Sequence, residues 1–138
     1  MALSHSHPYD RRVKMFDLAE IDRQHRELVK LLKKMNEAVK SHKPRKEIYR
    51  IFEEVISYTE LHFATEERLM IQTKFPETKA HKNHHKQLLE DAYLFLKRLD
   101  DIEEHIFREW FNQWYYACVV THLRYQDRQI ENHISQLN

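Results

Sequence analysis

Apolar residues recur at alternating steps of three and four along most of the chain, the spacing that places side chains on one face of a helix. The first stripe holds Leu18, Ile21, His25, Leu28, Leu32, Met35 and Val39. The second holds Ile48, Ile51, Val55, Tyr58, His62, Thr65 and Leu69. The third holds His81, His85, Leu88, Ala92, Phe95 and Leu99, and the fourth holds Phe107, Phe111, Trp114, Cys118, His122 and Tyr125. The pattern predicts four amphipathic helices, each with an apolar face to bury.

Short breaks separate the four stripes. The segment Ser41–Lys46 contains Pro44, a residue suited to the first turn of a helix, and Pro76 interrupts the chain before the third stripe. Because short connections leave consecutive helices antiparallel, we predict an all-α fold, an antiparallel up-down-up-down four-helix bundle. The bundle is assigned to residues 17–138, and residues 1–16 are predicted to form an irregular N-terminal arm.

The composition agrees with long helices and argues against some partners. The 138 residues include no glycine and only three prolines, so the sequence has little of the chemistry that turns require. Lys and Arg total 23 against 22 for Asp and Glu, with no evident basic face, which argues against a nucleic-acid partner.

Several features of the sequence bear on location and assembly. The first residues lack the apolar core of a signal peptide, and the longest apolar run, residues 115–120, is too short to span a bilayer. The single cysteine, Cys118, fits a reducing compartment. We therefore expect a cytoplasmic protein with no membrane partner, as a monomer or a weak homo-oligomer. The aromatic segment 110–116 is expected to pack in the core, with a dimer surface as the alternative.

Five histidines fall on the four apolar stripes. Taken singly, a histidine on an apolar face is most often a core residue with its own hydrogen-bond partner. Each of the five would need such a partner, and a buried polar group without one costs about 1–3 kcal/mol. One metal centre would satisfy the whole set together with two nearby carboxylates. The candidate ligands are His25, His62, Glu66, His81, His85, His122 and Asp127.

The candidate ligands suit a first-row transition ion, because they combine imidazole with carboxylate. They exceed the ligands of one tetrahedral zinc site and suffice for two ions bridged by the carboxylates. Two pairs are four residues apart and lie one above the other on a helix, namely His62 with Glu66 and His81 with His85. His122 and Asp127 are five apart, about 140° around an ideal α-helix, so spacing alone does not pair them.

Four segments of the sequence resemble the hemerythrin family. They are IDRQHREL at 21–28, YTELHFATEERLM at 58–70, FPETKAHKNHHKQL at 75–88 and HLRYQD at 122–127. The resemblance covers most of the chain, and its parts occur in the order found in the family. It implies a four-helix bundle, a cofactor of two non-haem iron ions, and reversible binding of O₂ at one of them.

The resemblance also implies a role for each candidate ligand. The ligands of one iron would be His81, His85 and His122. The other iron, which keeps an open position for O₂, would be held by His25 and His62. The two irons would be bridged by an oxo or hydroxo group and by the carboxylates of Glu66 and Asp127. The residues at positions that line the O₂ pocket of the family are Leu28, Phe63, Val119 and Leu123.

One pocket position departs from the family pattern. Cys118 stands where the family usually has tryptophan, and Trp114 lies one turn earlier. A smaller residue beside the pocket could admit water, so we expect the oxygenated form to autoxidise faster than is usual for the family. The alternative is that Cys118 is an ordinary small buried residue.

Three classes of function are compatible with this sequence. We expect an O₂-binding protein, for storage, delivery or sensing, with no catalytic residues. The alternative is a di-iron enzyme acting on nitric oxide or peroxide, with Cys118 or Tyr125 supporting redox chemistry. The third class is a structural bundle or a site for zinc or manganese. The Glu-x-x-His motifs of ferritin-like di-iron proteins are absent, and a histidine-rich centre carries less negative charge, which favours binding over oxidative attack.

Overall fold

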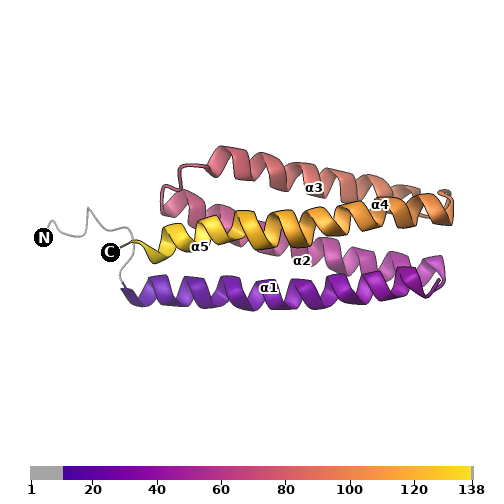
Figure 1. The fold of residues 1–138 in the computed structure, drawn as a ribbon, viewed down its shortest axis with the longest axis horizontal. Helices are drawn as coiled ribbons and strands as arrows, with labels where there is room; N and C mark the ends of the chain where they lie inside the picture. The colour runs from indigo at the N-terminus through magenta and orange to yellow at the C-terminus, as the bar shows by residue number, and fades with distance from the viewer. Residues whose placement is uncertain (1–10, 138) are drawn as a thin grey trace, which may run out of the picture.

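The computed structural model describes residues 11–137, which form four long helical rods (Figure 1). The first three rods are α1 (Arg11–Lys40), α2 (Arg45–Gln72) and α3 (Thr78–Arg98). The fourth rod is continuous and consists of α4 (Glu104–Tyr116), the π-helix η2 (Ala117–Gln126) and α5 (Asp127–Ser135). Successive rods run in opposite directions, with α1 packed against α2 and the fourth rod, and α2 against α3. The predicted antiparallel four-helix bundle is confirmed.

The first helix begins earlier than the sequence pattern indicated. Residues 11–16, which were assigned to an irregular arm, belong to α1, and residues 1–10 lie outside the described residues. The segment Arg11–Phe16 contains neither glycine nor proline. Once the buried stripe from Leu18 onward holds the helix in place, each further residue adds a backbone hydrogen bond at little cost, so the helix extends past its apolar face.

Two helix ends adopt left-handed backbone conformations without glycine. His42 follows α1 and Lys74 follows α2, and both have φ of 56°. After α2, the Lys74 N–H donates to the Ile71 carbonyl and the Phe75 N–H donates to the Met70 carbonyl, the paired bonds of a Schellman motif. Because a side chain crowds the backbone at positive φ, both positions carry strain that glycine would avoid.

The core consists of two apolar clusters. The larger one extends from Leu28 of α1 and Phe63 of α2 to the far end of the bundle, where Phe52 contacts Phe107, Phe111 and Trp114 edge to face. The smaller cluster closes the end of the bundle where α1 begins and α5 ends, and it contains Ile21, Leu69, Met70, Phe75, Ile130 and Ile134. The candidate ligands lie where the two clusters meet: on α1, for example, His25 falls between Ile21 of the smaller cluster and Leu28 of the larger one. A polar layer therefore interrupts an otherwise apolar core.

The predicted helical stripes face the interior with one exception. Tyr125, placed on the buried face of the fourth helix, is 68% exposed. The prediction assumed an α-helix, but η2 has a wider turn, and this change of helical phase rotates Tyr125 out of the core. Among the described residues, no helix combines the length and apolar character that crossing a membrane requires.

We predict that Lys74→Gly stabilises the protein by roughly 0.5–1 kcal/mol, because glycine adopts the left-handed conformation without steric cost. The matched control is Lys33→Gly, an exposed position inside α1, which is expected to lose about 1 kcal/mol. Urea unfolding followed by circular dichroism measures both changes. Destabilisation by Lys74→Gly as large as that by Lys33→Gly would contradict the strain assigned to residue 74.

Candidate metal centre

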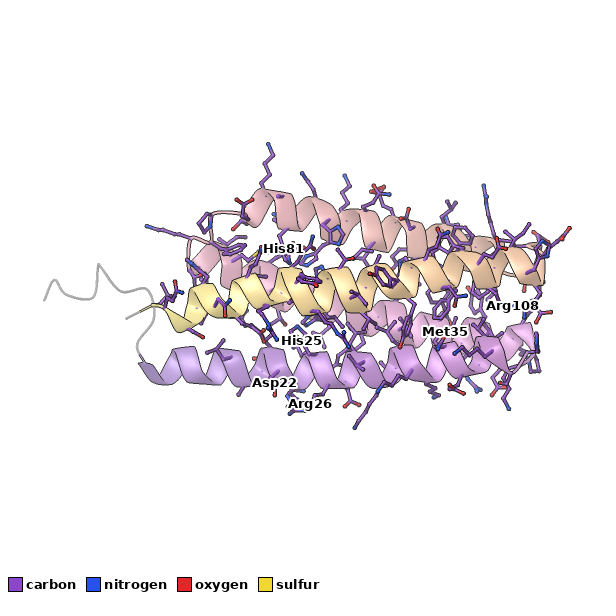
Figure 2. All side chains as sticks on the ribbon, in the orientation of Figure 1. Asp22, His25, Arg26, Met35, His81 and Arg108 are labelled. Carbon is purple, nitrogen blue, oxygen red and sulfur yellow. The ribbon has the colours of Figure 1, made fainter. Side chains whose placement is uncertain are left out.

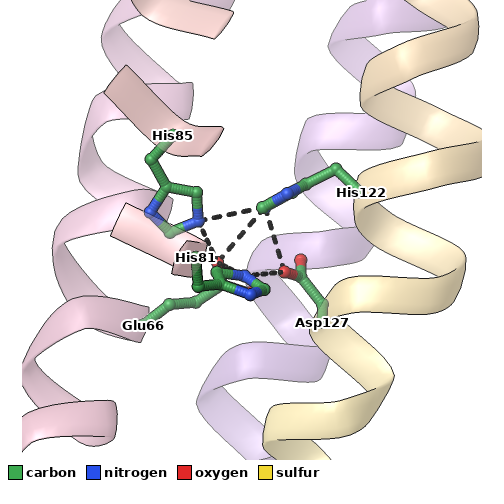
Figure 3. Close-up of side chains that lie close together, drawn as sticks. All are labelled: Glu66, His81, His85, His122 and Asp127. Atoms are coloured by element: carbon green, nitrogen blue, oxygen red, sulfur yellow. Dashed lines mark hydrogen bonds and ion pairs between the residues drawn. The ribbon is translucent and has the colours of Figure 1, made fainter. Parts of the chain in front are cut away.

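All seven candidate ligands meet in the polar layer inside the bundle. His25 and His81 are labelled on the whole molecule in Figure 2, and five of the ligands are drawn in Figure 3. Each rod contributes at least one of them: His25 on α1, His62 and Glu66 on α2, His81 and His85 on α3, and His122 and Asp127 on the fourth rod. Glu66, Asp127 and His62 are fully buried. The side chains form two groups whose ligand atoms lie within 4.8 Å of one another.

The first group contains three histidines and one oxygen from each carboxylate (Figure 3). Nε2 of His85 lies 3.0 Å from Oε1 of Glu66, and Nε2 of His122 lies 3.0 Å from Oδ1 of Asp127. Nε2 of His81 is 3.3 Å from the same Asp127 oxygen. Five donor atoms therefore surround one point, which is enough to hold a transition ion with a further position left over.

The second group contains two histidines and the other oxygen of each carboxylate. Oδ2 of Asp127 lies 2.8 Å from Nε2 of His25 and 3.0 Å from Nε2 of His62. Oε2 of Glu66 lies 3.1 Å from Nε2 of His62. Each carboxylate thus directs one oxygen into each group. This is the arrangement in which Glu66 and Asp127 would bridge two ions.

The π-helix brings His122 and Asp127 into one site. The Asp127 N–H donates to the His122 carbonyl, five residues earlier, where an α-helix would join residues four apart. A residue and its fifth successor therefore lie one above the other, instead of about 140° apart. The two side chains approach to 3.0 Å as a result. Spacing on an ideal α-helix did not predict this pairing, whereas the family pattern did.

Three ligand histidines are oriented by hydrogen bonds to Nδ1, the ring nitrogen that faces away from the site, and the sequence analysis did not identify the side chains that accept them. Nδ1 of His62 donates to Oε1 of Gln24, and Nδ1 of His122 donates to Oε1 of Gln126, both at 3.1 Å. Nδ1 of His85 donates to Oε2 of Glu67 at 2.8 Å. With a proton held on Nδ1, the lone pair of Nε2 points into the site, which is the form of histidine that binds a cation.

Sequence neighbours carried a signal for these partners. Glu67 directly follows a ligand, and Gln126 follows His122 by four residues, one helical turn. Gln24 precedes His25 but serves His62 on another helix, and its own amide N–H₂ donates to Thr65 Oγ1 at 3.1 Å. Only the packing of α1 against α2 reveals that contact.

Without a metal ion, protonated imidazoles balance the negative charge of the two buried carboxylates. Burial alone would raise the pKa of Glu66 and of Asp127, and for Asp127 the charge of Glu66 adds to this effect. The surrounding histidines outweigh it and hold both pKa values well below their usual range. Burial alone would lower the pKa of His25 and of His122, but hydrogen bonds and attraction from the carboxylates raise both to about 10.

The donor set fits a bound cation better than it fits internal hydrogen bonding. Oε2 of Glu66 is fully buried and accepts no hydrogen bond. Nε2 of His85 and Nε2 of His122 are 3.1 Å apart, a distance across which the two nitrogens can share only one proton. A cation in each group would satisfy these atoms at once and would replace the protons that now balance the carboxylates.

The candidate O₂-pocket residues lie on the side of the polar layer that faces the larger cluster. Leu28, Phe63, Cys118 and Leu123 are buried in that cluster, and Val119 packs against it partly buried. The ring of Phe63 stacks on His85 with centroids 3.8 Å apart and lies 6.2 Å from the ring of His62. The structure therefore brings an apolar wall against ligands of both groups.

We predict that the stability of the metal-free protein depends on pH. A raised histidine pKa contributes stability that is complete below the unfolded value of 6.5 and is lost as the pH rises to about 10, which applies to His25 and His122. The lowered pKa values of Glu66 and Asp127 contribute stability above about pH 4.5 that is lost as the pH falls. The metal-free bundle should therefore be most stable between these limits.

Thermal unfolding of chelator-treated protein measures this dependence. The melting temperature is expected to fall as the pH is raised from 6.5 to 10, whereas the metal-loaded protein should change much less because ions have replaced the protons. A melting temperature of the metal-free protein that stays level or rises over this range would contradict the protonation state assigned to the site.

Comparison with known proteins agrees with this geometry. The model of the hemerythrin HHE cation binding domain matches residues 17–136. A bacteriohemerythrin of Stenotrophomonas maltophilia (strain R551-3) is 29% identical over 123 residues, which cover 84% of this chain and 76% of the relative. A cluster of histidines and carboxylates able to hold metal lies inside the matched region. The chain therefore belongs to the hemerythrin family, whose members bind non-haem iron.

Proposed function

We propose that this protein holds two iron ions in the bundle core and binds O₂ reversibly at one of them, for storage, delivery or sensing. The observation that carries the proposal is that the two groups offer different numbers of ligand atoms. One offers three histidines and two carboxylate oxygens, and the other offers two histidines and two carboxylate oxygens. The group of His25 and His62 therefore leaves its ion one more position for an external ligand.

Bound iron would supply the electrons and the open coordination position that O₂ binding requires. The chain supplies the environment of that chemistry. The helices hold the imidazoles in place, with Gln24, Glu67 and Gln126 fixing three of the rings from behind. The apolar wall containing Phe63 and Leu28 limits water at the centre, which protects an oxygenated state from hydrolysis and protonation.

Two features favour binding over catalysis. Burial, with the charge of Asp127, raises the pKa of the Cys118 thiol, so this residue stays neutral and is a poor nucleophile. Tyr125 is 68% exposed, so most of its side chain faces solvent. The two residues that could assist an enzyme acting on nitric oxide or peroxide are thus unsuited to that role, and we propose no catalytic residues.

The proposal is tested by iron analysis together with visible spectroscopy of anaerobically reduced protein before and after exposure to air. We expect two irons per chain and a colour that appears in O₂ and disappears when O₂ is removed. Rapid irreversible oxidation, with turnover of nitric oxide or peroxide, would support the enzyme instead. A chain that retains one zinc and no iron would contradict both.

We predict that His25→Ala removes one ion and leaves the other. The three-histidine group keeps all of its histidines in this variant, so about one iron per chain should remain while the reversible colour is lost. The matched control is His105→Ala, an exposed histidine outside both groups, which should retain two irons and the colour. Retention of both irons and of O₂ binding by His25→Ala would contradict the assignment.

We predict that Cys118→Trp lengthens the lifetime of the oxygenated form. Cys118 is buried in the same cluster as the pocket residues, so a larger side chain there should exclude water from the centre. The control is Cys118→Ser, which removes the thiol without adding bulk and should not slow the decay. The rate is followed from the loss of the O₂-dependent absorbance in air. Equal decay rates for the tryptophan variant and the unaltered protein would contradict the idea.

A further inference from the structure

The seven ligands differ in how close they lie to solvent. Five of them have at most 1% of their surface exposed: His62, Glu66, His85, His122 and Asp127. The side chain of His81 is 3% exposed, and the side chain of His25 is 16% exposed. These two histidines are therefore the ligands that an ion arriving from solvent reaches most directly.

A pocket on the surface reaches the centre at His81. It has a volume of 550 Å³ and lies where the start of α3 faces the end of η2 and the first turn of α5. Its lining consists of Phe75, Pro76, Glu77, Ala80, His81, Gln126 and Gln129. Apart from the ligand itself, Glu77 is the one ionisable side chain in this lining, and Gln129 adds an amide oxygen, whereas the amide oxygen of Gln126 accepts from His122. Oxygen donors with one negative charge favour a hydrated divalent cation over an anion.

His81 is held less tightly than the other histidines of its group. Its Nε2 lies 3.3 Å from Asp127 and 4.0 Å from Glu66, whereas His85 and His122 each approach a carboxylate oxygen to 3.0 Å. Within residues 11–137, no acceptor bonds to the outer nitrogen of His81, which abuts the pocket. Rotation of this ring therefore breaks fewer hydrogen bonds than rotation of either neighbour.

On the opposite side of the centre the side chain of His25 is more exposed, but its ring is held on both edges. Nε2 of His25 makes the shortest contact of any ligand histidine with Glu66 or Asp127, 2.8 Å to Oδ2 of Asp127. Its outer nitrogen faces Glu131 at 3.8 Å, so an ion arriving there would meet a ring already engaged on both edges. The geometry favours entry past His81.

We propose that the pocket beside His81 is the entry site for divalent iron. Glu77 attracts the hydrated ion to the mouth of the pocket, where amide oxygen of Gln129 replaces part of its water. The ring of His81 would then rotate outward to bind the ion and rotate back toward Oδ1 of Asp127. The other oxygen of Asp127 belongs to the second group. This inference rests on the proposed metal centre and adds to it the path by which the centre fills.

The test is the rate at which metal-free protein takes up cobalt(II), followed anaerobically by the absorbance of the bound ion in a stopped-flow instrument. Glu77→Gln removes the negative charge from the pocket lining. Ala80→Phe places a bulky side chain that cannot bind metal at an exposed position of the same lining. Both should slow uptake by roughly threefold or more and leave the final amount of bound cobalt unchanged. The rate of Glu77→Gln should also depend less on salt.

Matched controls distinguish a change in the pocket from the effect of the same change of charge or bulk elsewhere on the protein. Glu90→Gln makes the same change of charge farther along α3, and Ala64→Phe adds the same bulk at an exposed position of α2 outside the pocket lining. Both controls should load at the rate of the unaltered protein. Glu131→Gln tests the opposite side and should likewise load normally.

Two results would overturn the entry route while leaving the centre in place. One is full cobalt binding at unaltered rates in both Glu77→Gln and Ala80→Phe. The other is slower uptake in Glu131→Gln than in Glu77→Gln, which would place the route at His25. Failure of the unaltered protein to bind cobalt would instead overturn the metal centre itself and the route with it.

Discussion

Two carboxylates with no exposed surface lie at the centre of this bundle, and the rest of the structure depends on balancing their charge. Glu66 and Asp127 would repel one another and would be protonated in an apolar core without compensation. Five imidazoles from four rods converge on their oxygens. Three of them, His25, His62 and His122, have pKa values raised by the two carboxylates and supply positive charge as protons in the metal-free protein. The same nitrogens supply lone pairs once cations occupy the site, so one arrangement serves both the empty and the loaded bundle.

The helices provide what such a centre needs. Ligands on long packed helices have little freedom to move, and the second layer of glutamine and glutamate side chains fixes three of the rings. The π-helix η2 is the local departure from regular structure that completes the site, because its wider turn aligns His122 with Asp127. The same change of phase turns Tyr125 toward solvent. The regular helices thus hold the ligands in place, and the π-helix η2 aligns the last two of them.

The apolar clusters on either side of the polar layer set the chemistry that the centre can perform. They exclude water from the ligands, and they hold the rods at the spacing that brings the two groups together. A surface pocket that His81 lines gives this centre a contact with solvent on the side of the three histidines. A centre enclosed by apolar side chains in this way is the environment that the proposed binding of O₂ requires.

Much of this protein is determined by its sequence alone. The four stripes predicted the rods, and histidine on every stripe predicted a shared centre, since buried polar groups need partners wherever they lie. Tertiary structure decided what a one-dimensional pattern does not contain. Packing fixes where α1 begins, at Arg11, and it brings Gln24 into hydrogen-bond contact with His62. The helical phase of η2 turns Tyr125 toward solvent. Which oxygen of Glu66 or Asp127 meets which histidine is set in three dimensions, because it requires the relative positions of all four rods.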